Sequence, residues 1–210
     1  MKVTIQAVEE RRDNVEKMLH DLGDSVDVEV YYDTRRISPL DSFVRMLDIP
    51  FSGYRLHLQD DVIIPKRFAE YFPVIESDMS EMGCKVLSVF APNRKDIHEA
   101  ANRGEKYIVF KNFLWLQATV FSDDAVKDMK QYYSEKTAAG EEVGEGKHDD
   151  CFVQEYMKSY GEKAYVHIPS LVQHNVFMGS VMSHSNSKHR MSKIYDPNFI
   201  SQYLENNKEG

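Results

Sequence analysis

Cysteine, long apolar runs and glycine-rich phosphate loops are scarce or missing in this sequence of 210 residues. Its two cysteines, Cys84 and Cys151, are far apart, so no disulfide framework is expected and a reducing compartment is the natural setting. No apolar run approaches the ~20 residues of a membrane-spanning helix. Charged residues follow the first eight, which is unlike a signal peptide. We therefore expect a cytoplasmic protein.

Positive charge is also in short supply. The chain has 26 Lys and Arg residues against 34 Asp and Glu residues, which gives a net charge of −8. A long nucleic-acid footprint usually requires an excess of Lys and Arg, so a general nucleic-acid-binding surface is not expected, while a local basic patch stays open. The length and the hydrophobic content of 42% suit one globular domain over residues 1–210.

Alternating strand and helix patterns predict an α/β fold, with a mixed, mainly parallel sheet flanked by helices. The expected strands are 3–8, 26–33, 54–64, 85–92, 106–112 and 164–169. The expected helices include one through Val15 and Leu22, one capped by Asp41, one over 68–72, and those at 123–133 and 151–160. Neither GxxxxGK(S/T) nor GxGxxG is present, so the usual phosphate cradles are missing. Glycine and glutamate over 136–148 predict a mobile loop near 134–148, and the polar end of the chain predicts a flexible C-terminal tail.

Two adjacent acids, Asp60 and Asp61, interrupt the apolar run at the end of the third predicted strand. Ligands of α/β sheets bind at the carboxyl ends of the strands, and carboxylates there suit Mg²⁺ or Mn²⁺. A solvated Asp-Asp turn is the plain alternative, but apolar residues on both sides set this turn against a core. His174, which follows a later strand, could complete a cation site, although a lone His is more often structural.

A second acid pair, Asp149 and Asp150, follows the glycine-rich loop and precedes a helix. Capping and the helix dipole favour acids at a helix start, which explains the pair without any chemistry. A carboxylate in this place could also act as a general base, with the loop closing over substrate.

The basic residues with a possible role are few. Arg11 and Arg45 lie on helices next to strand ends and could contact a nucleotide, although solvated arginine is the default. Lys188 and Arg190 belong to the densest positive cluster of the chain. This cluster is either a solvated tail or a flap that neutralises a leaving diphosphate.

Taken in order, these features resemble small glycosyltransferases of the GT-A fold. The resemblance rests on TIQAVEERRDNVEKML, VEVYYD ending at Asp33, the DxD-like LQDDV, FLWLQATVFS, HDD before a helix, and PSLVQH. It runs from about residue 3 to about residue 190. The sequence departs from the family at Gln59, where many members have Glu, which would leave the metal site with one fewer acid.

The resemblance implies a metal-dependent transferase using a nucleotide-diphosphate sugar, most simply a UDP-sugar, with Mn²⁺ or Mg²⁺. The implied roles are donor binding for Arg11, Asp33, Arg45 and Asp60; metal binding for Asp61 and His174; acceptor or sugar contact for Trp115 and Gln117; phosphate contact for Lys188 and Arg190; and general base for Asp149 or Asp150. The base assignment holds only if the reaction inverts the anomeric centre. A buried core role for Trp115 is at least as natural.

The acceptor and the reaction class stay open at this point. Compact family members occur in bacteria and bacteriophages, including ones that glycosylate modified DNA bases, so a hydroxymethylated base in the host cytoplasm is one candidate acceptor. A nucleotidyltransferase is an alternative, although AVEERRDN lacks the glycine expected after the first strand. A non-catalytic module that binds a nucleotide or sugar is the other.

Overall fold

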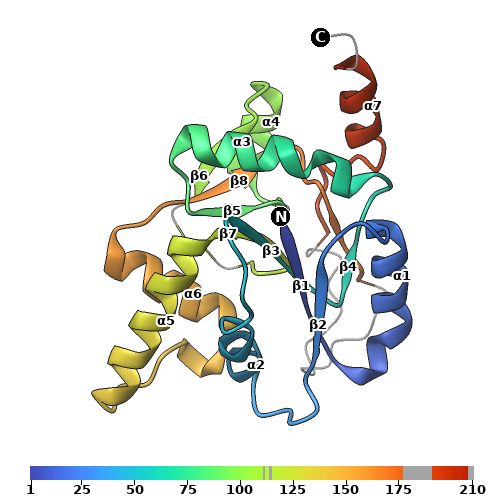
Figure 1. Cartoon of the computed structure of the whole chain (residues 1–210). Helices are drawn as coiled ribbons and strands as arrows, with labels where there is room; N and C mark the ends of the chain where they lie inside the picture. The colour runs from blue at the N-terminus through green and yellow to red at the C-terminus, as the bar shows by residue number, and fades with distance from the viewer. Residues whose placement is uncertain (111, 114, 177–190, 208–210) are drawn as a thin grey trace.

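The computed structural model describes residues 1–110, 112–113, 115–176 and 191–207. Its centre is a seven-stranded sheet with the order β2-β1-β3-β7-β5-β8-β6 (Figure 1). The strands are β1 (Lys2–Ala7), β2 (Val28–Tyr32), β3 (Tyr54–Gln59), β5 (Val86–Ser88), β6 (Tyr107–Phe110), β7 (Ala118–Ser122) and β8 (Ala164–His167). Strands β1, β2, β3, β5 and β8 point one way, while β7 and β6 run against their neighbours. The predicted α/β fold is therefore confirmed.

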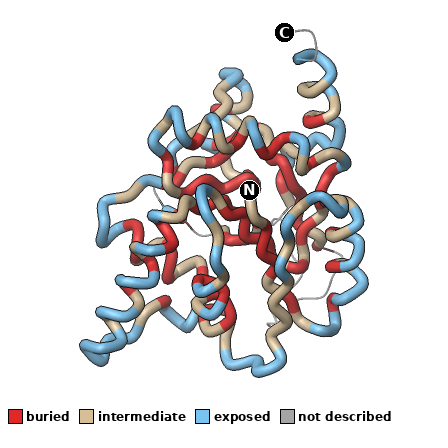
Figure 2. Tube along the Cα trace, viewed as in Figure 1, coloured by how far each residue is buried: buried red, intermediate tan, exposed pale blue. Residues whose placement is uncertain are grey.

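Helices cover both faces of the sheet and build two apolar cores. One core contains α1 (Arg12–Leu22) and α3 (Phe72–Met82), and the other contains α2 (Pro39–Met46), α4 (Lys95–Asn102), α5 (Asp123–Ala138) and α6 (Asp149–Tyr160). The remaining elements are η1 (Glu9–Arg11), η2 (Phe68–Tyr71), η3 (Glu145–Lys147), α7 (Phe199–Asn206) and a small second sheet of β4 (Val62–Ile63) and β9 (Gln173–His174). Figure 2 shows the buried backbone concentrated in the sheet and on the inner sides of the helices. No described helix has the length and apolar character that crossing a membrane requires.

The alternation of side chains along β3 decides where its polar residues lie. Successive side chains of a strand point to opposite faces of a sheet. Leu56 and Leu58 belong to the core beneath α1 and α3, whereas Arg55 and His57 are fully buried on the opposite face. There His57 packs edge-on against Phe43 of α2, with ring centroids 5.0 Å apart. The strand therefore ends with Gln59 facing the α2 side.

Several element boundaries differ from the sequence expectations. Ser38, not Asp41, caps α2, because the Ser38 Oγ accepts a hydrogen bond from the Asp41 N–H at 3.0 Å and Pro39 opens the helix. Helix α5 continues to Ala138, so the loop before α6 is shorter than predicted. Strand β7 was not predicted: FLWLQATVFS contains a central strand that pairs antiparallel with both β3 and β5. The helix expected over 68–72 is a 3-10 turn that leads into α3.

Candidate functional site

Asp60 begins the turn that follows β3, and both of its carboxylate oxygens accept hydrogen bonds. Oδ1 accepts from Nη1 of Arg11 at 2.5 Å, and Oδ2 accepts from the N–H of Val8 at 2.8 Å. The backbone is tied down as well, because the Asp60 N–H donates to the carbonyl of Gln6 at 3.0 Å and Asn14 donates to the Asp60 carbonyl at 2.6 Å. Asp60 is thus a buried, saturated carboxylate that joins β1, α1 and β3.

Arg11 provides the positive charge that allows two adjacent acids to be buried. The same Nη1 that contacts Asp60 lies 3.1 Å from Oδ2 of Asp61. Burial lowers the pKa of Arg11, but the two carboxylates outweigh this effect, so its pKa is raised and the guanidinium stays charged. Burial raises the pKa of Asp60 even though Arg11 opposes the shift. A buried acid pair without such a partner would be costly.

Asp61 meets His174 across the small second sheet. Val62 of β4 pairs with His174 of β9, and the Asn175 N–H donates to the Asp61 carbonyl at 2.7 Å. This brings Nε2 of His174 to 3.3 Å from Oδ2 of Asp61. Burial raises the pKa of Asp61, but His174 and Arg11 outweigh it and the pKa is lowered, so Asp61 is an anion at neutral pH.

A cation at this turn would have two protein ligands available. Oδ1 of Asp61 and Nε2 of His174 are buried and have no hydrogen-bond partner among the described residues, whereas both oxygens of Asp60 are occupied. Nε2 is the ring nitrogen of His174 that faces Asp61. Within the same part of the chain, no three carboxylate, imidazole or thiol groups form a closed metal cage. Mg²⁺ is usually held by one or two carboxylates together with substrate phosphates and water. The donor set fits a cation shared with a diphosphate.

On the opposite face of β3, Gln59 contacts the second acid pair. Its Nε2 donates to Oδ2 of Asp149 at 3.2 Å, and Oδ1 of Asp149 accepts from the Asp150 N–H at 2.9 Å. Burial, followed by the charge of Asp150, raises the pKa of Asp149 to about 6. Asp150 is partly buried, and its Oδ1 accepts from the Cys151 N–H at 2.8 Å. Gln59 is therefore a partner of Asp149.

Gln6 and Gln117 flank Gln59 on the neighbouring strands. Gln6 is the register partner of Gln59 in β1, and the Gln59 N–H donates to the carbonyl of Gln117 at 2.9 Å. The Oε1 atoms of Gln6 and Gln117 are buried without a described partner, as is Nε1 of Trp115. Gln6 was missed at the sequence level, where the only signal was a polar residue at the end of the first strand.

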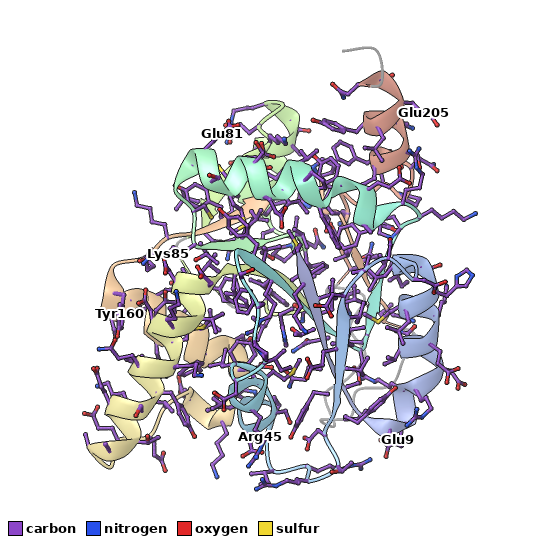
Figure 3. The ribbon with its side chains drawn as sticks, viewed as in Figure 1. Glu9, Arg45, Glu81, Lys85, Tyr160 and Glu205 are labelled. Atoms are coloured by element: carbon purple, nitrogen blue, oxygen red, sulfur yellow. The ribbon has the colours of Figure 1, made fainter. Side chains whose placement is uncertain are left out.

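The other predicted donor-binding residues lie in different settings. The Asp33 N–H donates to the Ala7 carbonyl at 2.7 Å, which places Asp33 beside the acid turn, while its Oδ1 accepts from two backbone N–H groups of its own loop. Arg45 lies on α2 (Figure 3), where its side chain is 42% exposed and forms an ion pair with Asp41 at 2.9 Å. The structure does not bring Arg45 to the acid turn. Lys188 and Arg190 lie outside the described residues.

An open hollow of about 660 Å³ lies between the start of α2, the end of α5 and the loop before α6. Its lining includes the acids Asp41, Glu141, Glu142, Glu145 and Glu155, together with Lys147. In this loop, Gly144 packs closely against His148, the residue before Asp149. A Cβ added to Gly144 would lie only 2.7 Å from the His148 carbonyl oxygen. The charged residues that line the hollow are predominantly acidic.

Fold and site together define an α/β protein with a preformed acid–histidine pair at the carboxyl edge of its sheet. No model of a known protein family matches the sequence, and no curated protein does. A197 from STIV is a similar solved structure, with a TM-score of 0.45 and 14% identity over 82% of this chain and 84% of that chain. A nucleoside-diphosphate-sugar pyrophosphorylase from Vibrio cholerae RC9 gives 0.43 and 11%, over 82% and 75%. A UDP-glucose pyrophosphorylase complexed with UDP-glucose gives 0.39 and 7%, over 79% and 72%. Likeness at this level does not transfer a function from one protein to another.

Proposed function

We propose that this protein is a glycosyltransferase of the GT-A type that uses a divalent cation and a nucleotide-diphosphate sugar. The observation that carries the proposal is a pair of buried ligand atoms without a hydrogen-bond partner among the described residues, Oδ1 of Asp61 and Nε2 of His174. Nε2 lies 3.3 Å from the other carboxylate oxygen of Asp61, at the turn that follows β3. Most buried polar groups are satisfied, and a bound ion is one explanation for a buried group that has no partner in the protein. An anion and an imidazole that face one another suit Mn²⁺ or Mg²⁺.

Gln59 links the two parts of the proposed site, because it directly precedes the acid turn and its Nε2 contacts Asp149. Asp61 and His174 would hold the cation, which supplies Lewis-acid stabilisation of the leaving diphosphate. Asp149 accepts the proton of the acceptor hydroxyl as that oxygen bonds to the anomeric carbon and the bond from this carbon to the diphosphate oxygen breaks. A pKa of about 6 leaves Asp149 mostly ionised at neutral pH while keeping it close to the working pH, which favours a general base.

The remaining residues position the donor. Asp60 and Arg11 fix the acid turn through their mutual ion pair at 2.5 Å, so their role is to hold Asp61 in place. Asp33, whose second carboxylate oxygen is not used in its own loop bonds, is placed to contact the nucleoside. The acidic hollow between α2, α5 and the loop before α6 disfavours a DNA strand in that place, because phosphates would be repelled there. A neutral hydroxyl acceptor fits this surface better than a modified DNA base does.

Calorimetry with UDP, GDP, CDP, ADP and dTDP, each with and without MnCl₂, tests the cation site. We expect one nucleotide diphosphate to bind only with Mn²⁺, and Asp61→Asn and His174→Ala to weaken that binding at least about tenfold each. Glu81→Gln, an exposed acid on α3, is the matched control. Binding that is indifferent to Mn²⁺ or to both substitutions would remove the cation from the proposal.

The products distinguish the reaction class. A glycosyltransferase releases the nucleotide diphosphate from its sugar donor, slowly to water and faster with an acceptor alcohol. A nucleotidyltransferase instead releases pyrophosphate from a nucleoside triphosphate and a sugar phosphate. Chromatography of both reactions with the wild type and with Asp149→Asn separates the two. If neither product forms but a nucleotide diphosphate binds, the chain is a binding module.

A further inference from the structure

Three glutamines stand side by side at the carboxyl edge of the sheet. Gln6 ends the pairing of β1 with β3 opposite Gln59, and the Gln59 N–H bonds to the Gln117 carbonyl on the other side. We call Gln6, Gln59 and Gln117 the glutamine row. It crosses three adjacent strands, β1, β3 and the start of β7, and it lies on the face that Asp149 covers.

The amide groups of the row are only partly used within the protein. Nε2 of Gln6 donates to the Pro39 carbonyl at 3.1 Å, which fixes the amide orientation and leaves Oε1 of Gln6 as the free end. That Oε1 and Oε1 of Gln117 are buried without a described hydrogen-bond partner. Leaving buried acceptors unsatisfied costs stability, so a ligand whose hydrogen-bond donors reach these oxygens would remove that cost.

The position of the row defines what can lie over it. Gln59 directly precedes the acid turn with Asp61, and its side chain contacts Asp149. In the proposed transfer reaction, the sugar must lie between the diphosphate at Asp61 and the base at Asp149. If the proposed function is correct, the sugar of the donor lies over the glutamine row.

We propose that the glutamine row is a donor-sugar subsite that selects an uncharged, hydroxyl-rich sugar. Amide oxygens accept hydrogen bonds from sugar hydroxyl groups and carry no charge that could pair with a carboxylate. The charged side chain that contacts the row is Asp149, an acid, which would repel a uronate carboxylate nearby. A hexose satisfies the buried oxygens, whereas the matching hexuronate brings a second negative charge towards Asp149.

The decisive comparison needs no substitution. With the nucleotide diphosphate identified by calorimetry, the affinities of its hexose and hexuronate conjugates are measured with MnCl₂; for UDP these are UDP-glucose and UDP-glucuronate. The two differ only at C6, where a hydroxymethyl group replaces a carboxylate. We expect the hexose conjugate to bind at least about tenfold more tightly at pH 7.5. Equal or tighter binding of the hexuronate would overturn the proposal.

A substitution locates the effect at the row. Gln117→Met keeps the length of the side chain and removes the amide oxygen, and Gln131→Met on the exposed surface of α5 is the matched control. We expect Gln117→Met to weaken binding of the hexose conjugate about tenfold and to leave binding of the nucleotide diphosphate unchanged. An unchanged affinity for the conjugate would overturn the role of the row. If no nucleotide diphosphate binds to the wild type at all, the proposed function itself fails, and the subsite fails with it.

Discussion

The two sides of the turn that ends β3 treat polar groups in opposite ways. On the side of α1, Asp60 and Arg11 satisfy one another at 2.5 Å, and every carboxylate oxygen of Asp60 is bonded. On the side of α2 and α6, Gln6 and Gln117 retain buried oxygens without described partners, and burial raises the pKa of Asp149. The contacts of Asp60 hold the turn in place, whereas the glutamines on the second side keep buried acceptors without described partners. Two neighbouring residues, 59 and 60, therefore have different tasks because the strand alternates.

The largest effect is expected from a substitution on the side of α2 and α6. Asp149→Asn removes the proposed base while preserving the shape of the side chain and one acceptor for Gln59. We expect kcat to fall by roughly 10²–10⁴-fold with donor affinity unchanged, because a general base contributes about that much. Asp150→Asn is the control, since Oδ1 of Asp150 already accepts from the Cys151 N–H. Steady-state rates and calorimetry measure the two effects, and a larger loss in Asp150→Asn would exchange the roles of the two acids.

The next largest effect is expected from a substitution on the side of α1. Arg11→Met leaves Asp60 and Asp61 as adjacent buried acids without their cation, so the free energy of unfolding at pH 7 should fall by about 3–5 kcal/mol. Arg12→Met is the neighbouring control, because Arg12 is exposed and pairs with Glu9 on the surface, where such pairs contribute little. Urea denaturation measures both variants. If both variants lose a similarly small amount of unfolding free energy, Arg11 is not the partner that allows the acids to be buried.

The raised pKa of Asp149 predicts a pH dependence of stability. Its pKa is about 6 in the fold against 3.8 for an unperturbed Asp, so the folded state binds more protons between these values and stability falls as pH rises through them. The loss is on the order of 3 kcal/mol in total and is complete above the folded pKa. Urea denaturation of wild type and Asp149→Asn from pH 3.5 to 7.5 checks this. The difference between the two curves should change in that window and be flat above it.

A smaller change sharpens the contact between the two motifs. Gln59→Glu replaces the amide that donates to Asp149 with a second carboxyl group, so the pKa of Asp149 should rise further. We expect the acidic limb of the kcat/KM profile to move up by about one pH unit. Gln131→Glu adds the same charge on the exposed surface of α5 and should leave the profile in place. If the acidic limb of the kcat/KM profile stays in place in Gln59→Glu, Gln59 does not influence the pKa of Asp149.

The smallest expected effect concerns Arg45, which lies apart from both sides. Its ion pair with Asp41 is on the surface, and among the described residues no hydrogen bond or ion pair joins Arg45 to the acid turn. Arg45→Ala should therefore change the affinity for the nucleotide diphosphate by less than about twofold in calorimetry. A tenfold loss would restore the donor-binding role that the sequence resemblance implies for it.

Local patterns predicted the fold well because alternation and helical spacing are properties of short segments. The order of strand, helix and strand through β3, and the acids at its end, could be read directly. Strand β7 could not, because its pairing partners β3 and β5 are distant in the sequence. The cap of α2 was misplaced for a related reason: Ser38 and Asp41 are both good capping residues, and only backbone geometry distinguishes them.

The site was predicted as a set of residues but not as a set of contacts. Asp61 and His174 do meet, and Asp149 does lie near the acid motif. The use of Arg11 as the partner of the acids, and of Gln59 as the partner of Asp149, depends on which face each side chain takes. The resemblance assigns roles by order along the chain, so it carries no information about these faces.

The pairing of β4 with β9 has a consequence for the order in which the site can be made. A ribosome adds Asp61 long before His174, and N-terminal parts of a chain begin to fold first. Arg11, from the first helix, is already present when the acids are synthesised and can pair with them at once. His174 arrives only with the last third of the chain, when the Val62–His174 pairing becomes possible. The nascent protein can thus pair Arg11 with its acid turn early, and the proposed cation site is complete only after His174 has been added.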